Sequence, residues 1–426
     1  MRQGSRWRTG GLLCLLLLSP AVPAGAAEAS KSSGILELDV GPLDCPRPVS
    51  STCFRSLFDP PYRSPEPAPA PRLSIEAANT TYAYNIESQS TFIKRPYNCQ
   101  GYYCFRGEQE VNGFTAIGDF ATLQLRYAVS STVSLYGGAF FAIPFGGADT
   151  IRQIRPVLTL NYQPVDGVNL LAGTIQPRHP FHDAVFDDLR YFVRPVEQGF
   201  QFLVNQKYYQ QDLFFNWYQE NTHQNNERFD IGYIGKAKFG PLRLNAQLHW
   251  DHAGGEIPFP DFRTISAQNN MVWAGGPELA FASPLGRDGL IHEVGAAFTF
   301  LGDRDEPNQR TPVLTSKGHA HEIRGWINVA GFRLSAARWK SSNFVTSTGD
   351  IFYSVDKMTE VNFVKFFDLN QFAAIEVGGW VRMIDRKSVA SGYDGAPANS
   401  FYAAFHWNFD VALGKVNTRS PGSAGK

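Results

Sequence analysis

The stretch FYAAFHWNFDVAL, residues Phe401 to Leu413, alternates apolar and polar residues with hardly a break. In an extended strand, successive side chains point to opposite faces. One face would carry Phe401, Ala403, Phe405, Trp407, Phe409, Val411 and Leu413, and the other Tyr402, Ala404, His406, Asn408 and Asp410. The first face is almost wholly apolar and aromatic, so it requires either a core or an apolar solvent beside it.

Composition narrows the choice of fold and partner. The chain has 426 residues, of which 43% are hydrophobic and 14% aromatic, enough for several soluble domains or one large barrel. Its 39 Lys and Arg residues balance 39 Asp and Glu residues. A formal net charge of zero gives no indication of a polyanionic partner, so we expect no nucleic acid.

The N-terminus has the pattern of a secretory signal peptide. Arg2, Arg6 and Arg8 precede the apolar run Leu12 to Leu18, and Ala24-Gly25-Ala26 supplies small residues for cleavage. We therefore expect residues 1–26 to be removed. Residues 27–72 are rich in Pro and predict an extended periplasmic segment that could dock a periplasmic partner. No later stretch is apolar for long enough to form a membrane helix.

Cysteine usage fits an exported protein. Cys45, Cys53, Cys99 and Cys104 remain after the signal, an even number that predicts disulfides. Pairing of Cys45 with Cys53 and of Cys99 with Cys104 is the simplest of three connectivities. The alternative for Cys99 and Cys104 is a metal site, but no nearby Cys or His pair completes one. We expect no metal and no cofactor.

The spacing of breaks predicts a membrane barrel between residues 73 and 413. Segments of roughly ten residues alternate in hydrophobicity, as strands between lipid and lumen must. Short breaks lie at residues 129–131, 164–167, 205–207, 240–241, 284–288, 330–331 and 368–370. Longer polar breaks interleave with them at 84–116, 146–152, 178–195, 220–227, 251–270, 302–318, 341–357 and 385–399. The fold class is thus all-β, a transmembrane antiparallel barrel of about 16 strands with short periplasmic turns and long extracellular loops. Residues 414–426 would form a flexible tail.

A secreted sandwich or propeller is the soluble alternative, since it also alternates apolar and polar residues. It would not need aromatic residues at its strand ends. Tyr127, Tyr162, Trp217, Trp250 and Phe409 all fall close to predicted ends, which is typical of interfacial girdles. The membrane barrel is favoured.

The final strand carries a resemblance to a known group. Its aromatic spacing at Tyr402, Phe405, Trp407 and Phe409, with the signal peptide and the alternating turns and loops, resembles the porins of the Gram-negative outer membrane. The resemblance implies an outer-membrane location, insertion by the barrel-assembly machinery and contact with membrane lipid. Porins often pack as trimers, so a homotrimer is a further expectation.

The face opposite the lipid predicts the function. A barrel this wide leaves an aqueous channel unless it is plugged, and opposed charged walls favour small hydrophilic solutes. We therefore expect a passive or weakly selective channel. The alternative for each single charge is an ordinary solvated or paired group. The predicted pore-lining residues are Arg126, Arg155, Lys236, Lys238, Arg243, Arg324, Arg333, Arg382, Asp212, Asp230, Glu322, Glu376 and Asp410.

One outer connection is unusually rich in ionisable groups. It is a candidate constriction loop, a divalent-cation site or an ordinary polar loop, and the last is favoured because it lacks the spacing of a metal motif. Its residues are Arg178, His182, Asp183, Asp187, Asp188 and Arg190. Nearby aromatic residues such as Tyr136, Trp326 and Trp380 either stack on sugars or fill space inside the wall.

Two other functions compete with the channel. A hydrolase could place Asp187-Asp188 and Asp251-His252 at the outer rim, but adjacent residues diverge in a strand, and no G-x-S-x-G motif is present. We therefore expect that the chain is not an enzyme. A conduit for export of a secreted polysaccharide is the remaining alternative, although the balanced lumen does not favour an anionic polymer.

Overall fold

The computed structural model describes only part of the chain. The first 71 residues lie outside it, and with them the predicted signal peptide, the Pro-rich segment, Cys45 and Cys53. The described residues are 72–88, 91–100, 103–111, 113–146, 153–177, 179–187, 194–206, 208–222, 227–254, 267–282, 290–306, 315–330, 332–370, 373–385 and 397–415.

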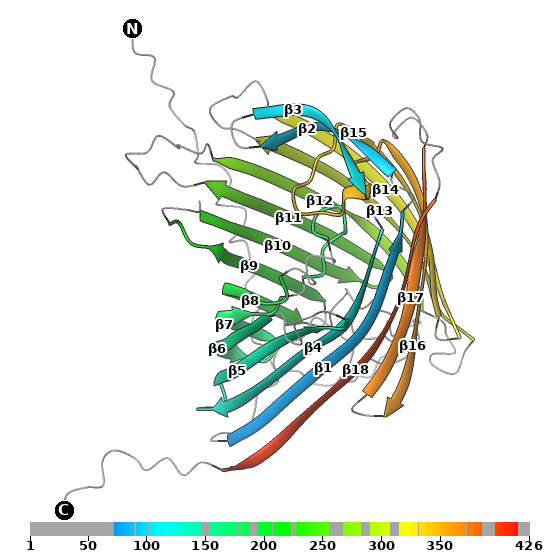
Figure 1. Cartoon of the computed structure of the whole chain (residues 1–426). Helices are drawn as coiled ribbons and strands as arrows, with labels where there is room; N and C mark the ends of the chain where they lie inside the picture. The colour runs from blue at the N-terminus through cyan, green and yellow to red at the C-terminus, as the bar shows by residue number, and fades with distance from the viewer. Residues whose placement is uncertain are drawn as a thin grey trace, which may run out of the picture. The chain divides into compact units, whose positions relative to one another are not determined.

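Sixteen strands close into one antiparallel barrel (Figure 1). The first half of the ring comprises β1 (Arg72–Glu87), β4 (Phe114–Ala128), β5 (Val133–Pro144), β6 (Gln153–Val165), β7 (Val168–Ile175), β8 (Glu197–Gln206), β9 (Tyr209–Gln219) and β10 (Glu227–Phe239). The second half comprises β11 (Leu242–Gly254), β12 (Gln268–Ala282), β13 (Ile291–Glu306), β14 (Ser316–Val329), β15 (Phe332–Ser342), β16 (Lys357–Asn370), β17 (Ala373–Ile384) and β18 (Ala398–Lys415). The barrel closes where β1 pairs with β18 along its whole length.

The predicted order of turns and loops is confirmed. Four of the seven predicted short breaks fall between two strands, those at 164–167 and 205–207 overlap the ends of β6 and β8, and the one at 368–370 lies in the last residues of β16, just before the turn to β17. All of these turns lie at one end of the barrel, which we call the turn end, because neighbouring strands are antiparallel. The longer connections lie at the opposite end, the loop end. In membrane barrels the long loops are extracellular.

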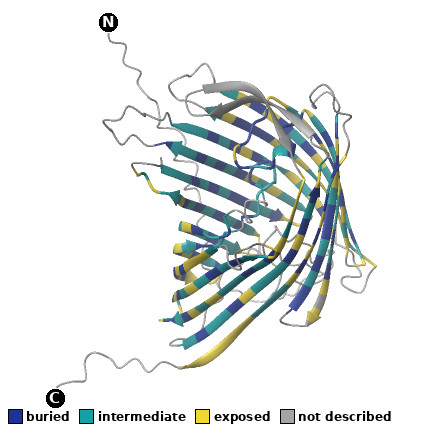
Figure 2. Cartoon of the chain, viewed as in Figure 1, coloured by how far each residue is buried: buried dark blue, intermediate teal, exposed yellow. Residues whose placement is uncertain are grey.

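The outer wall is apolar. Along β18, Phe401 is 53% exposed and Phe409 39% exposed, whereas Tyr402 and Ala404 are buried on the inner face. Figure 2 shows the same alternation of buried and exposed residues along other strands. Exposed Leu123, Leu158 and Phe200 continue the apolar face around the ring. The predicted apolar solvent of the Phe401 face is therefore lipid. Within the described residues, no helix has the length and apolarity to cross a membrane.

One long connection contains structure that the sequence analysis did not predict. Residues 84–116 were expected to form a loop, but β1 continues to Glu87 and a separate hairpin follows, made of β2 (Thr91–Gln100) and β3 (Tyr103–Val111). Its register places Cys99 directly opposite Cys104, which suits the predicted disulfide, although the side chains of the hairpin are outside the described part. The segment contains three Gly, three Asn and one Pro, residues that favour turns and loops over strands.

The strand predicted near residues 271–283 is β12, despite its Gly275-Gly276-Pro277 sequence. Its ladder with β13 runs from Gly275 opposite Phe300 directly to Glu278 opposite Ala297. Pro277 has no N–H to donate, which explains the interruption. A Cβ atom at Gly276 would lie 1.9 Å from the carbonyl oxygen of Phe298, so only glycine permits this close approach.

Candidate functional site

Two loop-end connections fold into the barrel instead of covering its rim. The first lumenal segment, residues 179–187, follows β7, and the second lumenal segment, residues 343–356, follows β15 and contains the short 3-10 helix η3 (Ile351–Ser354). Two backbone bonds join them: the Asp187 N–H donates to the Thr348 carbonyl and the Asp350 N–H to the Asp183 carbonyl, both at 2.8 Å. A Cβ at Gly349 would lie 2.2 Å from the Ala184 carbonyl oxygen. The two segments therefore meet at a position that requires glycine.

An apolar core inside the barrel holds both segments. Ala184 and Val185 from the first segment, and Phe344 and Tyr353 from the second, are buried against inward-facing side chains such as Trp339. The Trp339 indole N–H donates to the Val355 carbonyl oxygen at 3.0 Å. This burial stabilises the segments in the lumen by the same hydrophobic effect that forms a soluble core.

His179 fixes the start of the first segment. Its Nδ1 lies 2.7 Å from Asp212 Oδ2 and its Nε2 2.9 Å from Glu197 Oε2, while its ring stacks on Phe214 with centroids 3.6 Å apart. Burial alone would lower the pKa of His179, but the charges of Asp212 and Glu197 outweigh it and raise that pKa to about 10. His179 is therefore a buried cation between two carboxylates at neutral pH.

A cluster of arginine and glutamate side chains lies beside the segments. Arg324 contacts Glu322 at 2.8 Å and Glu360 at 3.0 Å, and Arg382 contacts Glu360 at 2.7 Å. Arg382 also pairs with Asp350 of the second segment. The two cations thus share one carboxylate, Glu360, and each arginine also pairs with a second carboxylate, so neither buried cation is left without a partner.

The first segment joins this cluster through two neighbouring residues. His182 Nε2 lies 3.3 Å from Glu322 Oε1, and Asp183 Oδ2 lies 3.8 Å from Arg382 Nη2. Burial, followed by the nearby charge of Glu360, raises the pKa of Asp183 to about 6 even though Arg382 opposes the change. Its side chain is 38% exposed, so the screening by water limits the energetic consequence.

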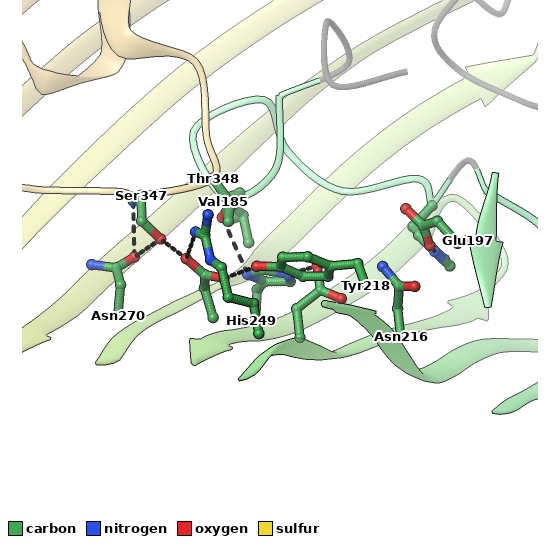
Figure 3. A network of polar contacts seen from close by, with 12 residues as sticks. Val185, Glu197, Asn216, Tyr218, His249, Asn270, Ser347 and Thr348 are labelled. Carbon is green, nitrogen blue, oxygen red and sulfur yellow. Dashed lines mark hydrogen bonds and ion pairs between the residues drawn. The ribbon is translucent and has the colours of Figure 1, made fainter. Parts of the chain in front are cut away.

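Thr348, His249 and Asp230 form a hydroxyl, imidazole and carboxylate relay, of which Figure 3 labels Thr348 and His249. The Thr348 Oγ1 lies 3.2 Å from His249 Nδ1, and His249 Nε2 lies 3.3 Å from Asp230 Oδ2. The single proton of the Thr348 hydroxyl is donated to the Val185 carbonyl at 2.9 Å in this structure, so Thr348 can pass it to His249 only once that contact breaks. Such a relay can activate a hydroxyl as a nucleophile because the imidazole accepts its proton and the carboxylate stabilises the imidazolium.

A second polar group adjoins the relay. Ser347 is exposed, and its hydroxyl donates to Asp251 Oδ2 at 2.9 Å. The Tyr218 hydroxyl donates to Asp251 Oδ1 at 2.5 Å, and Arg228 lies 3.9 Å from the same carboxylate. Figure 3 shows Ser347 and Thr348 side by side, between Asn270 on one side and Tyr218 on the other. The accessible hydroxyl therefore borders the buried one.

Most of the predicted pore-lining residues face inward, but many are paired rather than free. Arg126 lies 3.5 Å from Glu76, Arg243 pairs with Glu278 and Glu293, and Arg333 lies over Trp326. Arg324, Arg382 and Glu322 belong to the cluster above, Asp212 holds His179, and Asp230 holds His249. Glu376 accepts from the Tyr402 hydroxyl at 2.8 Å, and Lys236 and Lys238 line a cavity of about 60 Å³ at the turn end. Arg155 and Asp410 are exposed.

The candidate constriction loop is only partly described. His182, Asp183 and Asp187 lie in the first lumenal segment, whereas Arg178, Asp188 and Arg190 fall outside the described residues. The loop between β11 and β12 likewise lies outside them from residue 255 to residue 266. Across the part of the chain that the structure describes, no group of three or more His, Cys, Asp or Glu residues is arranged to hold a metal ion.

The Asp251-His252 pair considered from the sequence does not come together on one face of the barrel wall. Asp251 faces the lumen, but His252 faces outward, where its Nδ1 lies 2.7 Å from Asn269 Oδ1. The relay instead uses His249, two residues before Asp251 on the same face, and a threonine 99 positions away in the chain. His249 and Asp251 lie two positions apart, so they share the inner face of β11 close to its loop end. This spacing was the one signal in the sequence that pointed to His249.

A comparison with protein families identifies the family of this chain. The Lipid A 3'-O-deacylase-type family matches residues 66–370, from the start of the barrel to the end of β16, including both lumenal segments. The chain belongs to this family. The expectation that this deacylase-type protein is not an enzyme is therefore wrong, since the family is one of enzymes. No curated protein sequence matches the chain at a significant level.

Solved structures of outer-membrane proteins resemble this deacylase-type barrel only distantly. OmpT of Vibrio cholerae is 11% identical, with a TM-score of 0.45 over 79% of this chain and 100% of that one. The anion-selective porin of Comamonas acidovorans is 9% identical, with a TM-score of 0.45 over 79% and 99%. OprD of Pseudomonas aeruginosa is 9% identical, with a TM-score of 0.40 over 80% and 94%. These likenesses do not bear on the activity.

Proposed function

We propose that this protein is an outer-membrane hydrolase that removes an ester-linked acyl chain from a lipid A-type glycolipid. Membership of the Lipid A 3'-O-deacylase-type family supports this substrate class. The observation that supports a site in this chain is the Thr348, His249 and Asp230 relay. It lies toward the loop end, which in membrane barrels faces the outside, so it is close to the level of the outer-leaflet headgroups.

Each member of the relay has a distinct role in the proposed reaction. The Thr348 oxygen attacks the ester carbonyl carbon while His249 accepts its proton, and Asp230 orients the imidazole and stabilises its charge. The bond from the carbonyl carbon to the sugar oxygen then breaks, and His249 returns the proton to that oxygen. Water hydrolyses the acyl-threonine ester by the same route, so the products are a fatty acid and the deacylated glycolipid.

The site is closed in this structure. Thr348 is 2% exposed, and its hydroxyl donates to the carbonyl of Val185 in the first lumenal segment. An ester can reach the hydroxyl only if that segment shifts. Exposed Ser347 lies next to Thr348 and defines the side from which a substrate would approach. We therefore place the entry between the second lumenal segment and the inner wall at Tyr218.

The test is mass spectrometry of lipid A from Gram-negative cells that express the protein or its variants. The wild type should produce lipid A lighter by one acyl chain. Thr348→Val keeps the side-chain shape, His249→Gln removes the base and Asp230→Asn removes the charge, so each should lower turnover by at least about a hundredfold. His252→Gln is the matched control on the outward face of the same strand and should retain activity.

Two outcomes would change this assignment. Full activity in the Thr348→Val variant combined with loss in Ser347→Ala would move the nucleophile to the exposed serine. No deacylation by a folded wild type in any membrane would contradict the enzyme itself. Folding of each variant is checked by the heat-dependent shift in gel migration that intact barrels give.

A passive channel is the second candidate. The width of a barrel of sixteen strands favours it, as do charged inner residues at the turn end such as Arg243. The two lumenal segments oppose it, because buried residues such as Val185 and Tyr353 occupy the lumen. The same occupancy opposes the export of a polysaccharide. Stable conductance steps in planar bilayers would support the channel, and a silent folded barrel would contradict it.

A further inference from the structure

The outer wall carries a patch of basic residues at the loop end of four adjacent strands. We call it the outer basic patch and define it by its outward-facing residues on β13 to β16: Arg304, Lys317, His319, His321, Arg338, Lys340 and Lys357. The ladders place Arg304 opposite Lys317 and His321 opposite Lys340, and Lys340 opposite Lys357. The patch is therefore contiguous in space, although it spans more than fifty residues of sequence.

The patch is accessible and carries excess positive charge. The side chain of Arg304 is 54% exposed and that of Lys357 is 43% exposed. These two pair with Glu306 and Asp385, but among the described residues Lys317 and Lys340 have no carboxylate partner. Even with both histidines neutral, five cations face two carboxylates. Like charges on neighbouring strands destabilise a sheet, so this arrangement needs an external anion to balance it.

The remainder of the outer wall differs. On the other described barrel strands, the outward positions in the loop half carry no Lys or Arg; Arg126, Arg155 and Arg382 all belong to the inner face. Toward the turn end of the patch, three of these strands, β13, β14 and β16, expose Phe298, Phe300, Ile323 and Val361. A band of cations thus borders an apolar wall. This arrangement matches a molecule that has an anionic head and acyl chains.

We propose that the outer basic patch binds the phosphate-bearing head of an outer-leaflet glycolipid, whose acyl chains lie against the apolar wall below it. Arg and Lys are the residues that bind phosphate oxygens by charge-assisted hydrogen bonds. Basic side chains at a membrane surface gain further from anionic lipid, at about 1 kcal/mol each, or about fivefold in affinity. The site is outside the barrel and separate from the lumenal relay, so it does not depend on the proposed hydrolysis.

The test measures binding and requires no catalysis. Full-length protein in nanodiscs of phosphatidylcholine is titrated with fluorescent diphosphoryl lipid A. The Lys317→Gln/Arg338→Gln/Lys340→Gln variant should bind about a hundredfold more weakly, following the fivefold effect of each cation. Lys340→Gln alone should weaken binding about fivefold. Its matched control is Lys365→Gln, since Lys365 lies near the turn end of β16, where it donates to the Ala330 carbonyl oxygen, and this variant should bind like the wild type.

Competitors distinguish the sources of the anion. Diphosphoryl lipid A should compete best and monophosphoryl lipid A less well, while inorganic phosphate at the same concentration should not compete. Equal competition by inorganic phosphate would show a simple anion site and overturn the proposal. Unchanged binding by the triple variant would overturn it too, because the apolar wall alone would then hold the lipid. All variants must show the gel shift of a folded barrel.

Discussion

Replacement of His179 by glutamine should release the first lumenal segment. The buried imidazolium lies between Asp212 and Glu197, and a neutral amide would leave two carboxylates without a cation. Removal of one partner from a buried ionic group costs about 3–5 kcal/mol. The raised pKa gives a similar value: an increase from 6.5 to about 10 corresponds to about 5 kcal/mol. The segment's local opening should become easier by this amount.

The dependence on pH has a definite sign. Because the folded-state pKa of His179 lies above its unfolded value, its stabilisation is complete below about pH 6.5 and is lost as the pH rises toward 10. Hydrogen exchange of residues 179–187, measured in detergent micelles between pH 6 and pH 10.5 and corrected for intrinsic rates, reports this opening. In wild type, protection should fall across that window.

The His179→Gln variant should lose protection by about a hundredfold to a few thousandfold at pH 6.5 and show little further change up to pH 10. His406→Gln is a control on β18, where the imidazole is only partly buried and lies 3.3 Å from Glu376. Equal protection of the first lumenal segment in wild type and His179→Gln would refute the role of the buried cation. If the protection of the wild-type segment did not change from pH 6 to pH 10, the raised pKa of His179 would be refuted.

Other perturbations test the contact between the lumenal segments and the barrel. Gly349→Ala should separate the two segments, because its Cβ would lie 2.2 Å from the Ala184 carbonyl oxygen; protease sensitivity within residues 343–356 should rise while the gel shift of the barrel persists. Asp183 has a pKa raised to about 6, so its neutral form stabilises docking below about pH 4 and this contribution is lost as the pH rises through 6. Asp183→Asn should remove that dependence, and an unchanged exchange profile between pH 4 and pH 7 would contradict it. Trp339→Ala removes a fully buried indole from the lumenal core, and about 3–5 kcal/mol of local stability should be lost in chemical denaturation followed by tryptophan fluorescence.

The barrel could be predicted from the sequence because the patterns that indicate it are local. Alternation along Phe401 to Leu413 and the short turns each involve residues near one another in the chain, and together they predict strand number and orientation. The lumenal segments depend on contacts of another kind. Thr348 bonds to Val185 across 163 positions, and no periodicity reveals such a contact.

The relay that we propose as the hydrolytic site has no local signal for the same reason. Residues adjacent in sequence, such as Asp251 and His252, point to opposite faces of a strand. Asp230 and His249 come from neighbouring strands whose register places Gly232 opposite His249, and Thr348 comes from a separate connection. The pairing register of two strands and the inward path of a loop both depend on tertiary contacts. A local sequence pattern therefore does not predict them.

The two lumenal segments also have a mechanical consequence. They leave the ring between β7 and β8 and between β15 and β16, and eight strands separate these points in either direction around the barrel. A pair of segments joined at Gly349 and fixed at both ends acts as a strut across a diameter. A wide, empty ring of strands flattens easily under lateral pressure from the bilayer, whereas a braced ring keeps a round cross-section. Any opening that admits a substrate must therefore also soften the wall.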